Sequence, residues 1–184
     1  MKILAISGSL RAASINTAIL QAAKRLAPSD AEIVLYRDLA GLPAFNPDDD
    51  RDPPPAPAAT LRAAVGAAEG LVFACPEYAH GLPGALKNAL DWLVGSTEFP
   101  GKPVMLINAA PRAFHAQASL REVLSTMSAQ LVADAFVTIS APRDANAEAL
   151  LAAPAIAGPL QAGLERFAAV LRAQARRTGE VFPV

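Results

Sequence analysis

Residues 2–17 read KILAISGSLRAASINT, and this stretch joins a continuous apolar run to a loop rich in hydroxyl side chains. The run Ile3–Ile6 lacks polar alternation, which is typical of a strand covered on both faces of a parallel sheet. Apolar residues at helical spacing begin at Ile15, so a helix follows the loop directly. The first N–H groups of a helix lack partners inside the helix and attract an anion. The stretch therefore predicts a buried strand, an anion-binding turn and a helix.

The alternation of short apolar runs and helical periods continues along the chain. Four further strands are expected at residues 33–36, 71–75, 104–107 and 135–139. Helices are expected over residues 15–26, 60–69, 83–94, 120–131 and 160–171. Pro83 suits the start of the third helix, because its missing N–H costs nothing there. Repeated β-α units predict one α/β domain over residues 1–184, with a parallel sheet and helices on both faces.

Composition excludes several classes of protein. With 53% hydrophobic residues in 184, the chain can build a core, and a net charge of −1 gives no reason to expect a nucleic-acid partner. No segment is long enough to span a bilayer, and the N-terminal apolar run is too short for a signal peptide, so no membrane partner is expected. Cys75 is the single cysteine, which indicates a reducing, cytoplasmic compartment and an inert, buried thiol.

Residues 43–57 break the β-α rhythm with six prolines and four aspartates. We interpret this segment as a surface loop. Its acidic residues are either solvated or form a cation site, and no ligand spacing supports a metal. No metal site is therefore predicted.

The first loop matches neither of two common phosphate motifs, G-x-x-x-x-G-K-[ST] and G-x-G-x-x-G. Hydroxyl groups and backbone N–H groups with one arginine suit a terminal monophosphate. The alternative is an ordinary capped helix with Ser14 or Asn16 as N-cap. One cap explains one such residue and leaves the others unexplained.

Residues 76–92 read PEYAHGLPGALKNALDW and follow the third predicted strand. Together with SGSLRAASINT, this stretch resembles the NADPH-dependent FMN reductase family of flavodoxin-like proteins, which includes quinone, azo-dye and chromate reductases. The match covers roughly residues 2 to 128. It implies a three-layer flavodoxin-like fold with a five-stranded parallel sheet in the order 2-1-3-4-5. It also implies an oxidoreductase that passes hydride from NADPH or NADH, via bound FMN, to a small-molecule acceptor: a flavin, quinone, azo compound or metal oxyanion.

The resemblance also implies positions for the cofactor. The residues expected to hold the FMN phosphate are Ser9, Arg11, Ser14, Asn16 and Thr17. Those expected along the ring are Pro76, Glu77, Tyr78, Ala79, His80, Gly81, Ala110 and Arg112. Either Arg11 or Arg112 could instead bind the extra phosphate of NADPH. No catalytic side chain is expected, because the flavin carries the chemistry. His80 and His115 are either exposed loop residues or contacts to flavin or nicotinamide, and His80 is the candidate for positioning a proton.

Two departures from the family keep alternatives open. Many members have asparagine after P-E-Y, where this chain has Ala79, and the loop at residues 109–116 lacks the glycines common in the family. Both changes could weaken FMN binding and would suit a regulatory flavin-binding module. A second alternative is a flavodoxin-like electron carrier, although such carriers usually dock through a strongly acidic surface.

Trp92 lies off the apolar stripe formed by Leu86, Leu90 and Leu93 in the third predicted helix. A tryptophan outside the core stripe indicates a partner surface. The family resemblance likewise implies a homodimer or homotetramer.

Overall fold

The computed structural model describes residues 1–180, with side chains through Arg177. Its parallel sheet has the order β2-β1-β3-β4-β5, which confirms the expected topology. The strands are β1 (Lys2–Ser7), β2 (Glu32–Tyr36), β3 (Gly70–Ala74), β4 (Pro103–Asn108), β5 (Gln130–Leu131) and β6 (Val137–Thr138).

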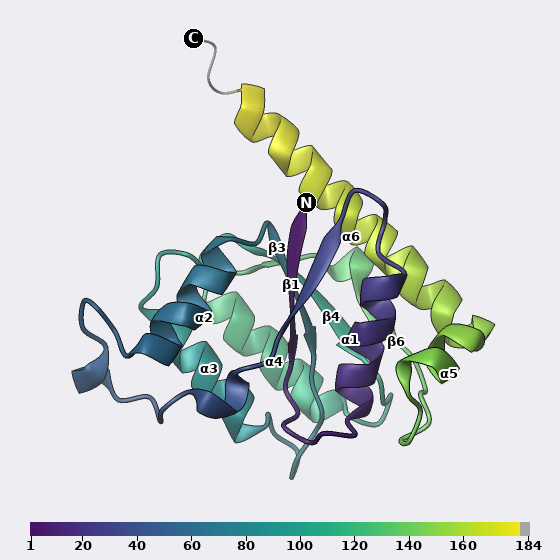
Figure 1. Cartoon of the computed structure of the whole chain (residues 1–184), viewed down its shortest axis with the longest axis horizontal. Helices are drawn as coiled ribbons and strands as arrows, with labels where there is room; N and C mark the ends of the chain where they lie inside the picture. The colour runs from purple at the N-terminus through teal and green to yellow at the C-terminus, as the bar shows by residue number, and fades with distance from the viewer. Residues whose placement is uncertain (181–184) are drawn as a thin grey trace.

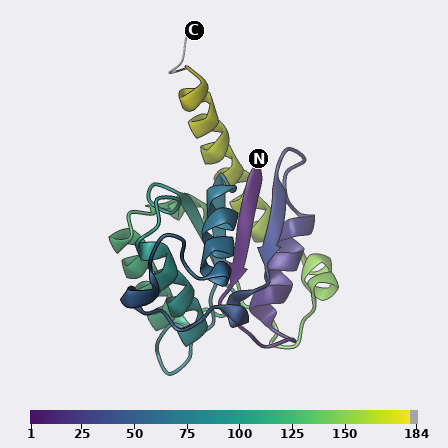
Figure 2. The same cartoon turned by 60° about the vertical axis from the view of Figure 1, so that its left-hand side comes forward.

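Helices cover both faces of the sheet and complete the three layers (Figures 1 and 2). One face packs against α1 (Ile15–Arg25), α5 (Ala147–Ala152) and α6 (Pro154–Glu180). The other packs against α2 (Ala56–Gly66), α3 (Gly84–Val94) and α4 (Phe114–Thr126). Because strand side chains alternate, Ile3 and Ala5 enter the first core while Leu4 and Ile6 enter the second. This two-sided burial explains the uninterrupted apolar run in β1.

The last strand differs from the prediction of one strand over residues 135–139. Two short strands, β5 and β6, lie beside β4 instead, and the 3₁₀ turn Ala133–Ala135 separates them. Alanine and aspartate are poor strand formers, which explains why the turn interrupts the pairing.

Helix α2 begins at Ala56, earlier than the expected start at residue 60. Pro57 lies in its first turn, where proline removes no helical hydrogen bond. The proline-rich composition therefore concealed a helix start.

Trp92 is fully buried, so the prediction that it forms a partner surface was wrong. Its Nε1 donates to the Pro43 carbonyl at 2.8 Å, and its ring packs edge-on against Phe45 with centroids 5.0 Å apart. Asn88, one turn earlier on α3, also donates to the Pro43 carbonyl, at 2.9 Å. The face of α3 outside the leucine stripe therefore holds the proline-rich loop.

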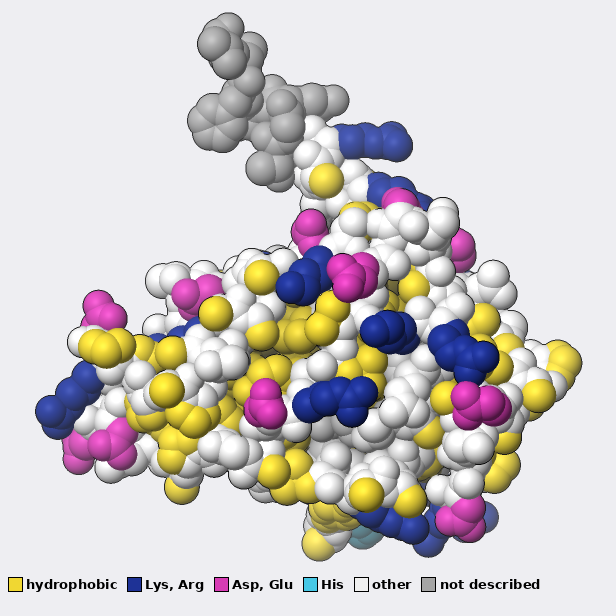
Figure 3. All heavy atoms as spheres, viewed as in Figure 1, with side chains coloured by type: hydrophobic (Ala, Val, Ile, Leu, Met, Phe, Trp, Pro, Cys, Tyr) yellow, Lys and Arg dark blue, Asp and Glu magenta, His cyan; other side chains and the backbone are white. Residues whose placement is uncertain are grey.

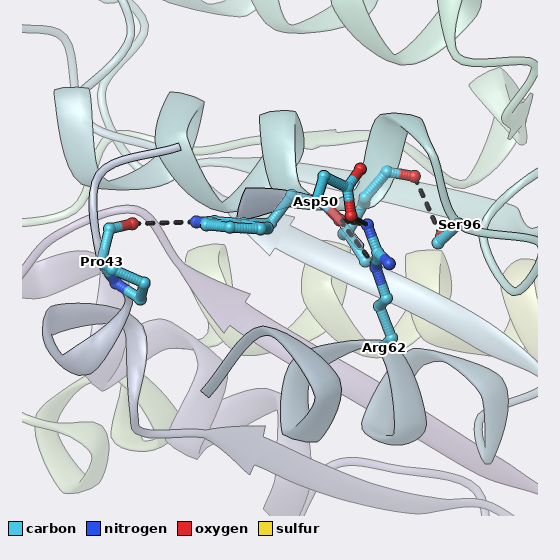
Figure 4. A network of polar contacts seen from close by, with 6 residues as sticks. Pro43, Asp50, Arg62 and Ser96 are labelled. Atoms are coloured by element: carbon cyan, nitrogen blue, oxygen red, sulfur yellow. Dashed lines mark hydrogen bonds and ion pairs between the residues drawn. The ribbon is translucent and has the colours of Figure 1, made fainter. Parts of the chain in front are cut away.

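The acidic loop is anchored a second time, through Asp50 (Figure 4). Arg62 on α2 donates to the Asp50 carboxylate at 2.8 Å and, through Nε, to the Trp92 carbonyl at 2.9 Å. Gly95 leaves room for this pair, because a Cβ there would lie 2.7 Å from Asp50 Oδ2. Of the loop's four aspartates, Asp50 is thus a structural partner rather than a solvated charge.

The carboxyl-terminal part of α6 extends beyond the sheet layers (Figure 1). Among the described residues, no helix is long and apolar enough to cross a bilayer.

Candidate functional site

Three loops lie together at the carboxyl edge of the sheet, because they follow the adjacent parallel strands β1, β3 and β4 (Figure 1). We call them the first loop (residues 8–14), the second loop (75–83) and the third loop (109–113). All three contain residues expected to contact a cofactor. Ligands of open parallel sheets bind at this edge.

The first loop leads into α1 through a hydroxyl-rich cap. Ser14 is the N-cap, as one reading of the sequence predicted, and its Oγ accepts from the Asn16 amide at 3.2 Å. Thr17 Oγ1 donates to Ser7 Oγ at 3.0 Å, and the Ser9 amide donates to the same oxygen at 3.3 Å. These bonds hold the hydroxyl groups around the start of the helix, where an anion is favoured.

Gly8 brings the first and second loops into contact. Its amide donates to the Ala74 carbonyl at 2.9 Å. A Cβ at this position would lie 3.0 Å from Leu86 Cδ2 and 3.3 Å from Pro76 Cδ. A side chain at residue 8 would therefore push the two loops apart.

The second loop forms a tight two-residue turn. Tyr78 and Gly81 exchange backbone hydrogen bonds of 3.1 and 2.9 Å. Both intervening residues are left-handed, with φ of 50° at Ala79 and 61° at His80. Asparagine and glycine favour this conformation, and alanine does not. The left-handed backbone at position 79 is therefore a reason for asparagine to be common there in the family, separate from any hydrogen bond that its side chain makes to a ring.

The first turn of α4 is tied to the second loop. Glu77 Oε2 accepts from the Ala116 amide at 3.0 Å, which satisfies one of the unpaired N–H groups of α4. The rings of His80 and His115 stack with centroids 4.3 Å apart, and His115 also contacts Phe114 at 4.0 Å. The two histidines that the sequence placed on separate loops are therefore neighbours.

The third loop contains the remaining predicted site residues. Asn108, at the end of β4, accepts from the Ala110 amide through Oδ1 at 3.0 Å. Arg112 is exposed in the same loop. Tyr78 and Phe114 are also exposed, at 54% and 61%, so aromatic surface is presented beside this edge of the sheet.

Three buried polar atoms near these loops have no hydrogen-bond partner. They are Asn16 Oδ1, at the start of α1, Gln117 Nε2, at the start of α4, and Tyr36 Oη, at the end of β2. Asn16 and Gln117 are less than 10% exposed. An unpaired buried polar atom is costly, so each calls for an explanation. Gln117 was missed because one glutamine on a helix has no distinctive sequence pattern.

The sequence analysis also missed two residues that line a pocket beside the first loop. Tyr36 and Arg37, at the end of β2, line a pocket of about 250 Å³ together with Ser9, Arg11 and Thr17. The sequence gives no signal for this contact, because β2 meets the first loop only in the folded sheet.

Cys75 is the first residue of the second loop, directly after β3, and is buried, as expected. Burial, with a smaller effect from Glu77, raises the pKa of its thiol to about 12. The thiol is therefore neutral at physiological pH and is not a nucleophile. Among the described residues, no group of three His, Cys, Asp or Glu side chains could hold a metal ion.

Residues 1–143 match the model of the NADPH-dependent FMN reductase family. The chain belongs to this family. Its members are oxidoreductases that use FMN with NAD(P)H as electron donor, so the cofactor and the class of reaction expected from the two loops are confirmed.

Relatives and solved structures agree with the family. The chain is 37% identical over 150 residues to an NAD(P)H-dependent FMN reductase of Pseudomonas aeruginosa, covering 79% of this chain and 80% of that protein. It is 36% identical over 138 residues to a 2-hydroxy-1,4-benzoquinone reductase of a Burkholderia species, covering 72% and 74%. FerB, a flavoenzyme NAD(P)H:(acceptor) oxidoreductase from Paracoccus denitrificans, is 25% identical with a TM-score of 0.70, covering 90% and 96%.

Proposed function

We propose that FMN binds across the first and second loops of this reductase, with its phosphate at the start of α1. The observation that carries the proposal is the contact at Gly8, which joins a hydroxyl-rich helix start to the loop that follows β3. The phosphate ligands would be the Ser9 and Thr17 hydroxyls, the Arg11 guanidinium and the first backbone N–H groups of α1.

The donor set fits a monophosphate, because hydroxyl, guanidinium and backbone N–H groups all donate to phosphate oxygens. Asn16 suits a different part of the cofactor. Its buried Oδ1 is an unpartnered acceptor, and a phosphate oxygen, which also accepts, would not satisfy it. The hydroxyl groups of the FMN ribityl chain are donors. We therefore assign Asn16 to the ribityl chain, with a side-chain rotation on binding.

The second loop would lie against the ring edge through the backbone groups of residues 76–81. The Glu77 side chain is engaged with α4, which supports a role for its backbone rather than for its carboxylate at the ring. Ala110 and Arg112 would approach the ring from the third loop.

Bound FMN would supply the redox chemistry, and the protein residues supply position and surroundings. The first loop fixes the phosphate end of the cofactor, and the tied second loop and α4 fix the wall beside its ring. No side chain is needed as a proton donor for hydride transfer. His80 stacks on His115, and this contact orients its ring within the turn.

We propose a quinone as the acceptor. The exposed rings of Tyr78 and Phe114, beside His80 and His115, offer flat apolar surface to a planar aromatic molecule. A metal oxyanion would gain nothing from these rings. The similarity to a 2-hydroxy-1,4-benzoquinone reductase supports the same choice.

A homodimer or homotetramer remains part of the proposal. Trp92 no longer supports it, because that side chain is buried. Its support is the family resemblance.

The test is a visible spectrum of the protein reconstituted with FMN, followed by NADPH or NADH under argon and then by an acceptor. We expect the flavin band to bleach with the donor and to recover fastest with a benzoquinone. If the flavin band recovered faster with chromate than with the benzoquinone, the proposal that the acceptor is a quinone would be refuted. A single reduction without steady turnover would favour the electron carrier.

A further inference from the structure

Gln117 is a buried amide in the first turn of α4, and its Nε2 atom has no hydrogen-bond partner within the described part of the chain. The residue is 6% exposed. An unpaired buried N–H group costs free energy, so an apolar side chain of the same size would be less costly at this position. The other buried amide with an unpaired atom, Asn16, is assigned above to the ribityl chain. Gln117 has no role in that assignment.

The Gln117 side chain belongs to the end of the molecule where the cofactor loops meet. Long side chains of a helix lean toward its N-terminus, and α4 begins at the carboxyl edge of the sheet, directly after the third loop. The preceding residue, Ala116, donates its amide to Glu77 of the second loop at 3.0 Å. Leu120 lies one turn later on the same buried stripe of α4. The Gln117 amide is therefore placed between the apolar core and the loops expected to surround the flavin ring.

The ring side chains near Gln117 are exposed, in contrast to its amide. His80 and His115 stack on each other at the surface, and Phe114 is 61% exposed. Figure 3 shows histidine atoms beside hydrophobic side chains at its lower edge, which is the carboxyl edge of the sheet in Figure 1. Gln117 is thus an inner group of the site. It is available to a ligand that enters between the loops and not to one that rests on the exposed rings.

The chemistry of the unpaired atom defines its partner. An amide N–H group only donates, so the group that Nε2 lacks is a hydrogen-bond acceptor. The Glu77 carboxylate is an acceptor that reaches α4, but its Oε2 is already engaged with the Ala116 amide. The pyrimidine edge of the FMN ring carries two carbonyl oxygens, and both accept. A buried donor beside the second loop therefore fits the ring of the cofactor.

We propose that Gln117 is a cofactor-positioning residue whose Nε2 donates to a carbonyl oxygen of the FMN ring. The proposal rests on the proposed function, which puts the ring against the second and third loops. Protein atoms cover Nε2 in this structure, so the contact requires the flexible glutamine side chain to rotate as the ring enters. A donor at a ring carbonyl stabilises the negative charge that reduction adds to the ring. Gln117 would therefore hold the ring and favour its reduced state.

The first test is Gln117→Met, which replaces the amide with an apolar side chain of similar length. The unpaired donor makes no bond in the FMN-free protein, so thermal unfolding without FMN should give a Tm equal to or above that of the wild type. The dissociation constant of FMN should rise about tenfold, because the hydrogen bond to the ring is lost. Gln161→Met, the same change at an exposed position of α6, is the matched control and should alter neither value.

The second test observes the contact directly and does not depend on turnover. A hydrogen bond to a carbonyl oxygen moves the resonance of its carbon downfield. In carbon-13 NMR of bound FMN labelled at both ring carbonyl carbons, one resonance should lie further upfield in Gln117→Met than in the wild type. The midpoint potential of the bound flavin should also be more negative. Gln117→Glu exchanges the donor for a carboxylate oxygen and should weaken FMN binding at least as much as Gln117→Met.

Three results would overturn the inference. A lower Tm of FMN-free Gln117→Met with unchanged FMN affinity would show that Gln117 bonds within the protein. Identical carbonyl resonances in Gln117→Met and the wild type would show that the amide does not contact the ring. Full FMN binding by Gln117→Glu would show that residue 117 does not act as a donor. Each of these results leaves FMN binding by the wild type intact, whereas a wild type that binds no FMN would refute the proposed function and this inference with it.

Discussion

The Glu77 carboxylate accepts a hydrogen bond from the Ala116 amide at 3.0 Å, across 39 positions of the chain. This bond links the loop after β3 to the first turn of the helix after β4. The cap of α4 is therefore supplied by the same loop that is expected to lie along the flavin ring. Movement of the Glu77 carboxylate away from the Ala116 amide would remove this helix cap.

Replacing Glu77 tests this link. Glu77→Leu removes the acceptor and should cost about 1 kcal/mol of stability, with about tenfold weaker FMN binding because the loop is no longer held. Glu77→Gln keeps an acceptor oxygen and should retain most of both. Thermal unfolding and flavin-fluorescence titration measure the two effects. The link is refuted if both variants bind FMN as tightly as the wild type.

Ala79 occupies a left-handed position that suits asparagine or glycine. Ala79→Gly and Ala79→Asn should therefore raise the free energy of unfolding, by about 1 kcal/mol, through relief of backbone strain. Ala113, with φ of −84°, is the matched control, and Ala113→Gly should not stabilise the protein. Chemical denaturation of the wild type and the three variants measures these free energies of unfolding. An Ala79→Gly variant that is less stable than the wild type would contradict the claim that the backbone at residue 79 is strained.

Trp92 is an internal anchor and should behave as one. Trp92→Phe loses the bond to the Pro43 carbonyl and some packing, at about 1–2 kcal/mol, which lowers Tm by roughly 2–8 °C in a protein of this size. Val94→Ala, at an exposed position of the same helix, should change stability little. Light scattering should give the same oligomeric state for all three proteins. If the Trp92→Phe variant dissociated into smaller oligomers without a fall in Tm, the result would support the interpretation of Trp92 as part of a partner surface.

The raised pKa of Cys75 predicts a pH dependence. Burial favours the neutral thiol, so its contribution to stability is complete below the pKa of an unfolded thiol, about 8.5, and declines as pH rises toward about 12. Cys75→Ala should therefore lose less stability than the wild type between those pH values. The native thiol should react slowly with a disulfide reagent at pH 8 and rapidly once unfolded. Rapid native reaction would show that the thiol is accessible.

Local patterns predicted much of the fold and part of the site. The apolar run of β1, the N-cap Ser14 and the leucine stripe of α3 depend on residues close together in the sequence, and these predictions were confirmed. The role of Trp92 was missed because its partner is a carbonyl 49 positions away. A helical stripe cannot reveal a loop that arrives from elsewhere in the chain.

The same limit applied to the site. The cap that Glu77 gives to α4 depends on the adjacency of β3 and β4, and the contact of Arg37 with the first-loop pocket depends on that of β1 and β2. The short strand β5 was missed because Leu131 continues the apolar spacing of the preceding helix, so residues 130–131 were predicted as helix. Family resemblance indicated which loops matter, and only the fold indicated how they are joined.

The central claim is that the start of α1 binds the phosphate of FMN. Fluorescence titration of the wild type with FMN and with riboflavin, which lacks the phosphate, tests this claim most directly. Charge-assisted hydrogen bonds predict at least about 100-fold tighter binding of FMN, and a much smaller difference in Arg11→Ala. Equal affinities for FMN and riboflavin in the wild type would contradict the account.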